Sequence, residues 1–110
     1  MAFKLVVRNK LRVPVKGELK DEDGNVVKFN FVLLCKRLNQ SQIDESINAG
    51  NQTVLEFLHA NVTGWEGVLD EDGAPMEFTD DNLASVLQEA GMHAVCFSAY
   101  LKEIGATAKN

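Results

Sequence analysis

Five apolar residues alternate with other residues over positions 27–35, and this pattern constrains the fold more than any other stretch of the chain. Strict alternation places such residues on one face of a β-strand. Residues 21–25, Asp-Glu-Asp-Gly-Asn, are typical of a tight turn, so we expect a hairpin with residues 11–19. Pro14 cannot donate a ladder hydrogen bond, which restricts its strand to an edge or a bulge. The alternating residues are Val27, Phe29, Phe31, Leu33 and Cys35.

Helix signals begin after Asn39. Ser41 suits a helix N-cap position, and Gly50 suits a helix end. Thr53 and a glutamate three residues later have the spacing of a capping box, which predicts a second helix that runs through Val62. The first two helices could also be continuous around Gly50.

Two further helices are predicted after a turn-rich segment. Thr79 suits the N-cap of a helix whose apolar residues recur at helical spacing from Leu83 to Ala90. Gly91 separates it from a last helix, which is apolar on two nearly opposite sides. Such a helix must be buried almost all round, either within this domain or beneath another subunit or protein. One side holds Phe97, Tyr100, Leu101 and Ile104, and the other holds Met92, Val95, Cys96 and Ala99.

These signals predict one α+β domain over all 110 residues. We expect an N-terminal antiparallel β-sheet of about three strands, including residues 3–8, followed by three or four packed α-helices. Residues 1–38 are then mainly β, and residues 39–106 are mainly α. Trp65 stands between two glycines and is interpreted as a core anchor, with an interface role as the alternative.

Charge is divided unevenly along the chain, whose net charge is -5. Residues 1–40 hold nine Lys or Arg and four acids, which is +5, and the remainder holds two bases and twelve acids, which is -10. A polarised molecule of this kind can associate head to tail or dock on a charged partner. The alternative is that the two halves face each other within the fold or are simply solvated.

The cysteines and histidines show no ligand spacing. Cys35 and Cys96 lie far apart in the sequence, so we interpret them as buried free thiols. His59 and His93 lack a carboxylate or cysteine neighbour at the spacing that a metal site needs. We therefore predict no metal and no cofactor.

Catalytic and nucleic-acid signatures are also missing from the sequence. The acidic runs 21–25 and 70–72 lack the continuation of an EF-hand loop, and turn chemistry explains both. Without a phosphate-binding loop, a nucleophile elbow or an evident triad, we predict that the protein is not an enzyme; a small hydrolase with a site built from distant residues is the alternative. Scattered bases without an aromatic platform argue against nucleic acid. The sequence shows no apolar run of about 20 residues and no signal peptide, so we expect a cytoplasmic protein without a membrane span.

Several segments follow one another in a characteristic order and spacing, and together they extend over most of the chain. They are Arg12-Val13-Pro14-Val15, Phe29-Asn30-Phe31, Lys36-Arg37-Leu38, the turn-to-helix segment 64–83, and Ala99-Tyr100-Leu101. In these features the chain resembles the bacteriophage tail assembly chaperones, small proteins encoded near the tape-measure gene of long-tailed phages and prophages. The segments bear the fold, and none of them is a catalytic signature.

The resemblance implies a function in tail morphogenesis without covalent chemistry. Chaperones of this family bind the long helical tape-measure protein, keep it soluble in the host cytoplasm and help to recruit tail-tube protein. A structural or connector subunit retained in the phage tail is the competing interpretation. We also expect a homo-oligomer, from the surplus apolar positions and the divided charge. The predicted partner or oligomer contacts are Val32, Leu34, Met92, Val95, Ala99, Tyr100 and Ile104.

Overall fold

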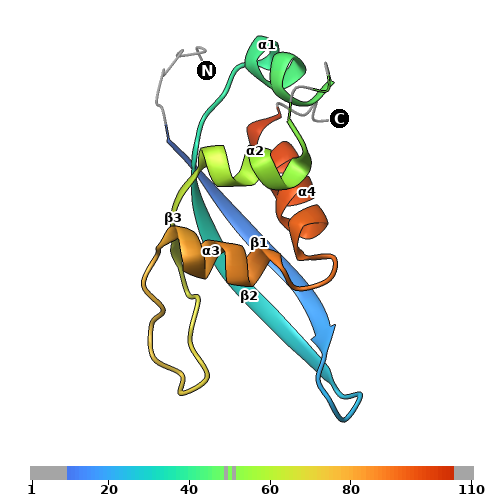
Figure 1. Ribbon diagram of the computed structural model, residues 1–110, viewed down its shortest axis with the longest axis vertical. Helices are drawn as coiled ribbons and strands as arrows, with labels where there is room; N and C mark the ends of the chain where they lie inside the picture. The colour runs from blue at the N-terminus through green and yellow to red at the C-terminus, as the bar shows by residue number, and fades with distance from the viewer. Residues whose placement is uncertain (1–9, 49, 51, 106–110) are drawn as a thin grey trace, which may run out of the picture.

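The computed structural model describes residues 10–48, 50 and 52–105. Over these residues a three-stranded antiparallel sheet carries its helices along one face (Figure 1). The predicted α+β class is confirmed. The described elements, in chain order, are β1 (Lys10–Lys20), β2 (Val26–Lys36), α1 (Gln40–Ile43), the π-helical segment η1 (Asp44–Asn48), α2 (Val54–Asn61), β3 (Val62–Glu66), α3 (Asp80–Leu87) and α4 (Met92–Ile104).

Strands β1 and β2 form the predicted hairpin, with eleven residues in each strand. The register pairs Val13 with Leu33 and Val15 with Phe31, so the alternating residues of both strands share one face. Among the described strands the order β1-β2-β3 leaves β1 at an edge, a position that suits Pro14. The sequence pattern therefore specified the hairpin and the buried face of β2.

The third described strand is β3, and its position corrects the prediction that the second helix continues through Val62. Helix α2 ends at Asn61, and Val62 begins β3. β3 pairs with the second edge of β2, where Trp65 lies opposite Leu33. The β-branched residues Val62 and Thr63 favour a strand, and the available edge of β2 supplies its hydrogen-bond partners. The predicted strand at 3–8 lies outside the described residues.

The helix starts confirm two predicted caps and correct a third. Thr53 and Glu56 form the predicted capping box at the start of α2. Hydrogen bonding to Thr53 lowers the pKa of Glu56, and the Thr53 backbone contributes more to this effect than the Thr53 side chain. At α1, however, the N-cap is Asn39 and not Ser41: its side chain accepts from the Gln42 amide, and the Gln42 side chain accepts from the Asn39 amide. An asparagine two residues earlier outcompetes the serine because it completes this reciprocal pair.

Thr79 caps α3 as predicted, since its hydroxyl accepts from the Asn82 amide at 3.1 Å. The helix ends at Leu87, so Ala90, which was assigned to its apolar stripe, lies beyond the helix and is exposed. Gly91 has a φ of 82°, a left-handed conformation that suits glycine and redirects the chain into α4.

The core lies between the sheet and helices α2, α3 and α4. Phe57 of α2 stands at its centre, with edge-to-face contacts to Phe97 at 5.4 Å and to Tyr100 at 5.3 Å between ring centroids. Trp65 packs against this core as predicted: its indole N–H donates to the Met76 carbonyl at 2.8 Å, and Phe78 lies 5.1 Å from its ring. The sheet contributes Val13, Val15, Phe31, Leu33, Cys35 and Val62, and the helices contribute Phe57, Leu58, Leu83, Leu87, Met92, Cys96 and Tyr100.

Candidate partner-binding surfaces

The seven predicted contact residues divide into core residues and surface residues. Met92 and Tyr100 are only 5% and 1% exposed, so they belong to the core and cannot contact a partner. The other five, Val32, Leu34, Val95, Ala99 and Ile104, are half-buried.

The inward side of α4 explains this division. Its buried residues Met92, Cys96 and Tyr100 recur every four residues and form one stripe. The sequence analysis assigned Met92 and Cys96 to one side and Tyr100 to the other, so the predicted division of the helix was wrong. Leu101 is exposed, because the side of α4 opposite this stripe faces away from the core.

Tyr100 has a structural role at the C-terminal end of this stripe. Its hydroxyl donates to the Lys36 carbonyl at 2.9 Å and so joins α4 to the end of β2. Burial raises the pKa of Tyr100 to about 12, although hydrogen bonding to the Leu38 backbone lowers this pKa. The phenol therefore stays neutral near pH 7 and acts as a hydrogen-bond donor.

Cys35 and Cys96 are buried free thiols, as predicted. Burial raises the pKa of each thiol to about 12, and the neighbouring Cys96 adds to the effect on Cys35. Because the thiolate is the nucleophile and metal ligand, both groups are held in their unreactive form near pH 7. The two residues pack as small apolar side chains.

The first candidate surface is a groove between α4 and the edge strand β1, here called the α4–β1 groove. It has a volume of about 520 Å³, and its lining includes Val95 and Ala99, two of the predicted contacts. Three lining residues, Ala94, Ser98 and Lys102, follow one another at four-residue spacing along α4, which places them on one side of the helix. The other lining residues are Glu103 of α4 and Pro14 and Lys16 of β1.

The chemistry of the α4–β1 groove suits the docking of side chains better than the addition of a strand. Pro14 lies at the edge of the sheet within the groove and has no amide hydrogen to offer an incoming strand. Ala94, Ser98 and Ala99 are small, so another backbone can approach α4 closely. Lys16 and Lys102 give the groove two positive charges beside the one negative charge of Glu103.

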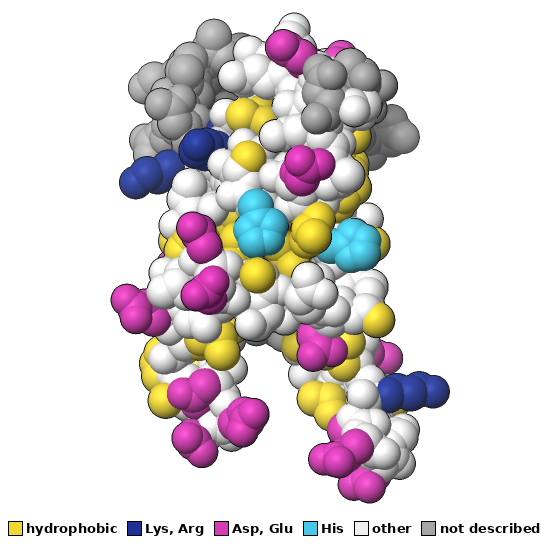
Figure 2. Space-filling view, in the orientation of Figure 1, with side chains coloured by type: hydrophobic (Ala, Val, Ile, Leu, Met, Phe, Trp, Pro, Cys, Tyr) yellow, Lys and Arg dark blue, Asp and Glu magenta, His cyan; other side chains and the backbone are white. Residues whose placement is uncertain are grey.

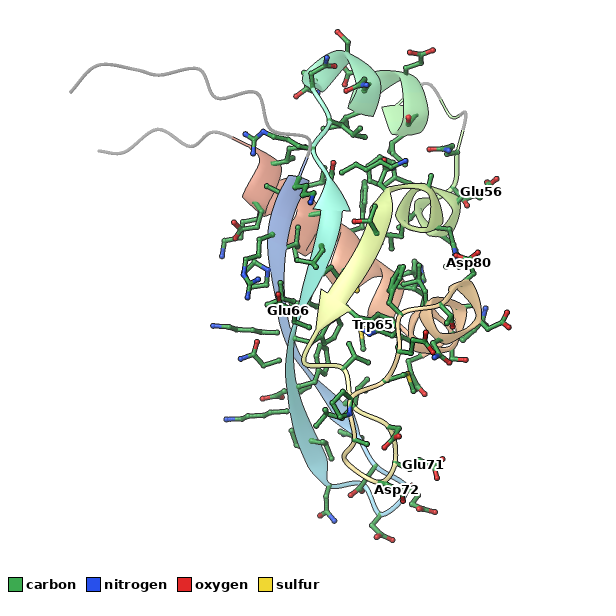
Figure 3. The ribbon with its side chains drawn as sticks, turned by 90° about the vertical axis from the view of Figure 1, so that its left-hand side faces the viewer. Glu56, Trp65, Glu66, Glu71, Asp72 and Asp80 are labelled. Carbon is green, nitrogen blue, oxygen red and sulfur yellow. The ribbon has the colours of Figure 1, made fainter. Side chains whose placement is uncertain are left out.

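The second candidate surface is the face of the sheet opposite the helices, here called the free face. Val32 and Leu34 lie at its centre, with Pro14 opposite Val32 in the register. Arg12 on β1 and Glu66 on β3, which is labelled in Figure 3, form a two-pronged ion pair across β2, with distances of 2.9 and 2.6 Å between nitrogen and oxygen atoms. Hydrogen bonding to Arg12 lowers the pKa of Glu66, and the same contact raises the pKa of Arg12. The pair joins the two outer strands over the apolar centre.

The free face also gathers most of the basic side chains of the first 40 residues. Six bases and two acids share the alternation that points to this face, and nitrogen-tipped side chains project from it in Figure 3. Acidic side chains dominate the view from the helix side in Figure 2. The division of charge along the sequence therefore becomes a division in space. The bases are Lys10, Arg12, Lys16, Lys20, Lys28 and Lys36, and the acids are Glu18 and Glu66.

Groups of three or more His, Cys, Asp or Glu side chains that could hold a metal ion do not occur among the described residues. Nor does any helix in this part of the chain combine the length and apolar character needed to cross a membrane. Comparisons of the chain with protein-family models, with curated proteins and with solved structures find no match. Function is therefore inferred from the surfaces of the chain itself and from the resemblance in its sequence.

Each surface includes residues that were not predicted from the sequence. Ala94, Ser98 and Lys102 have a signal that was available, namely their four-residue spacing, but small and polar residues carry little weight in a search for apolar contacts. The partnership of Arg12 with Glu66 had no such signal, because 54 positions separate the two residues and the strand β3 that carries Glu66 was not predicted.

Proposed function

We propose that this protein is a phage tail assembly chaperone that binds a helical segment of the tape-measure protein in the α4–β1 groove. The observation that carries the proposal is the groove itself, since it places Val95 and Ala99 beside small residues on a helix that its buried stripe anchors in the core. The family resemblance supplies the identity of the partner. No covalent step is involved, and the protein acts in the host cytoplasm.

Helix binding accounts for the composition of the groove. Helices recognised in grooves insert apolar side chains that recur every three or four residues, and small groove residues allow the two backbones to approach. Lys16 and Lys102 would pair with acidic residues beside that apolar stripe. Binding of this kind covers the apolar stripe of the tape-measure helix reversibly, which would prevent its aggregation until the tail-tube protein assembles around it.

Co-expression tests the proposal directly. Tape-measure protein produced alone should aggregate, and with this partner it should remain soluble and co-purify. Ala94→Arg places a long charged side chain in the groove at an exposed position, so the folded protein should remain stable while co-purification falls at least tenfold. Ala90→Arg is the matched control, because Ala90 is also exposed but does not line the groove.

Two outcomes would contradict the proposal. Equal solubility of the tape-measure protein with and without this partner would remove the chaperone function. Retention of the protein in purified mature tails would then favour the structural or connector subunit. Equal effects of Ala94→Arg and Ala90→Arg would leave the function standing but would move the binding site away from the groove.

A further inference from the structure

Two projecting arms of this molecule end in the same four residues. The hairpin arm, residues 17–29, turns at Asp-Glu-Asp-Gly (21–24), and the loop arm, residues 67–78, turns at Asp-Glu-Asp-Gly (70–73). A phenylalanine follows the glycine by five positions in each arm, as Phe29 and Phe78. The two segments are separated by helices α1 and α2, the segment η1 and strand β3, yet they have the same organisation.

The two turns also have the same hydrogen bonds. Asp21 Oδ1 accepts from the amides two and four residues later at 3.0 and 2.8 Å, and Asp70 Oδ1 does so at 2.9 and 3.0 Å. Gly24 and Gly73 adopt left-handed φ angles of 82° and 80°, which glycine takes without strain. Both tips are therefore turns closed by the same hydrogen bonds, and Glu22 and Glu71 at their middle are exposed.

Each arm is also fixed at its base by an aromatic contact. Phe29 lies 5.9 Å from Phe31 of the core, and Phe78 lies 5.1 Å from Trp65, measured between ring centroids. The Trp65 indole holds the loop arm further through its hydrogen bond to the Met76 carbonyl. Two rigid arms thus extend from one body, and Figures 1 and 2 show them at the same end of the molecule with an open notch between them.

The arms expose apolar surface as well as charge. The sheet face that the helices cover near Val15 continues along the hairpin arm through Val27 and Phe29, where no described helix covers it (Figure 1). Val27 is 48% exposed, and Leu69 of the loop arm is 56% exposed. Among the described residues, three of the four most exposed large apolar side chains lie on the arms: Val26, Val27 and Leu69. Exposed apolar surface bordered by charge is typical of an interaction site.

We propose that the two arms form a bipartite docking site for a partner segment that has apolar residues at its centre and Lys or Arg on both sides. Charge complementarity identifies this occupant, because each tip presents three carboxylates and both arms expose apolar side chains, Val27 on the hairpin arm and Leu69 on the loop arm. The site differs in sign from the α4–β1 groove, where Lys16 and Lys102 favour an acidic partner. It is therefore a second interaction surface, and it does not depend on the proposed binding of the tape-measure protein.

A designed peptide can serve as the probe. We would label an amphipathic peptide of Leu and Lys, about 14 residues or four helical turns long, and measure its binding to the full chain by fluorescence anisotropy. Two control peptides keep the pattern but replace Lys with Glu, or Leu with Ser. The Leu/Lys peptide should bind at least tenfold more tightly than either control, and its affinity should fall as salt is raised.

Variants of the arms then locate the site. Glu22→Lys and Glu71→Lys reverse one exposed charge on each tip, and each should weaken binding about fivefold. The double variant should lose about the product of the two effects, because the tips act at separate ends of the segment. Glu89→Lys, an exposed charge reversal away from the arms, is the matched control and should change binding little.

The apolar part of the site has its own matched pair. Val27→Asp should weaken binding of the Leu/Lys peptide about tenfold, whereas Val26→Asp, on the opposite face of the same strand, should weaken it much less. Equal loss in the two variants, or in Glu89→Lys and the tip variants, would overturn the proposal. Equal binding of the Leu/Lys and Leu/Glu peptides would also overturn the proposal. A dimer in light scattering that Val27→Asp converts to a monomer would do so too, because a second copy of the chain would then occupy the arms. Ala94→Arg should leave peptide binding unchanged, so failure here and failure of the proposed groove are distinguishable.

Discussion

The two faces of the sheet are built from the same strands, and adjacent residues have opposite roles. On the covered face Leu33 is buried among the helices, and its neighbour Leu34 on the free face is half-buried beside Gly64 of β3. The covered face contributes most to stability, because burying a side chain of this size is worth about 1.5–3 kcal/mol. The free face carries the bases and an ion pair between side chains that are 61% and 51% exposed, and such pairs stabilise a protein little. Alternation along the strands therefore separates the stabilising residues from those available for binding.

The largest change in stability is expected at Leu33, whose neighbour Leu34 lies on the other face of the same strand. Leu33→Asp would place an unpaired carboxylate in the core and should lower the free energy of unfolding by several kcal/mol, a large part of the roughly 5–15 kcal/mol available to a domain. Leu34→Asp, one residue further along, should cost about 1 kcal/mol or less, because its carboxylate can reach water. Chemical denaturation of both variants measures the difference. Equal destabilisation would mean that the free face is also buried, for example in an oligomer.

An intermediate effect concerns the close approach of β1 and β2 in the hairpin arm. A Cβ atom added at Gly17 would lie 2.5 Å from Cζ of Phe29, so Gly17→Ala must displace the ring from its place beside Phe31. We expect a loss of about 1 kcal/mol in the free energy of unfolding, since the ring can rotate away. Glu18→Ala on the free face should change stability by less than about 0.5 kcal/mol. A thermal stability of Gly17→Ala equal to that of the wild type would show that Phe29 does not cover Gly17.

Local signals in the sequence specified much of the fold. Alternation determined the face of β2, and the capping residues Thr53 and Thr79 marked where two helices begin. These predictions succeeded because each depends on neighbouring residues. Asn39 was overlooked as a cap because two candidate residues stood close together, and only the reciprocal bond with Gln42 distinguishes them.

Features that depend on distant residues could not be predicted in this way. β3 forms because β2 offers it an edge, and the short run from Val62 to Glu66 lacks an alternation strong enough to reveal this. Which side of α4 faces the core depends on where the sheet lies. The sequence alone cannot identify that side, because the helix is apolar on two sides. For the candidate site, Val95 and Ala99 were predicted to make contacts, but the groove around them needs β1 beside α4. The repeated acidic turns were each interpreted correctly as turns, and only the fold brings the two arms to one end of the molecule.

The smallest expected effect lies on the free face, at the ion pair of Glu66 with Arg12. Because the contact lowers the pKa of Glu66 below its ordinary value of 4.5, its contribution to stability is present above about pH 4.5. The contribution is lost as the pH falls through the lower value of the folded state, where the carboxylate takes up a proton. Glu66→Gln should therefore melt at a slightly lower temperature than the wild type at pH 7, and the difference should disappear in stronger acid and shrink in high salt. The decrease should be smaller than that of Gly17→Ala, since both side chains are largely exposed. A larger decrease, or one that persists in acid, would mean that the free face contributes to stability in the way that the covered face does.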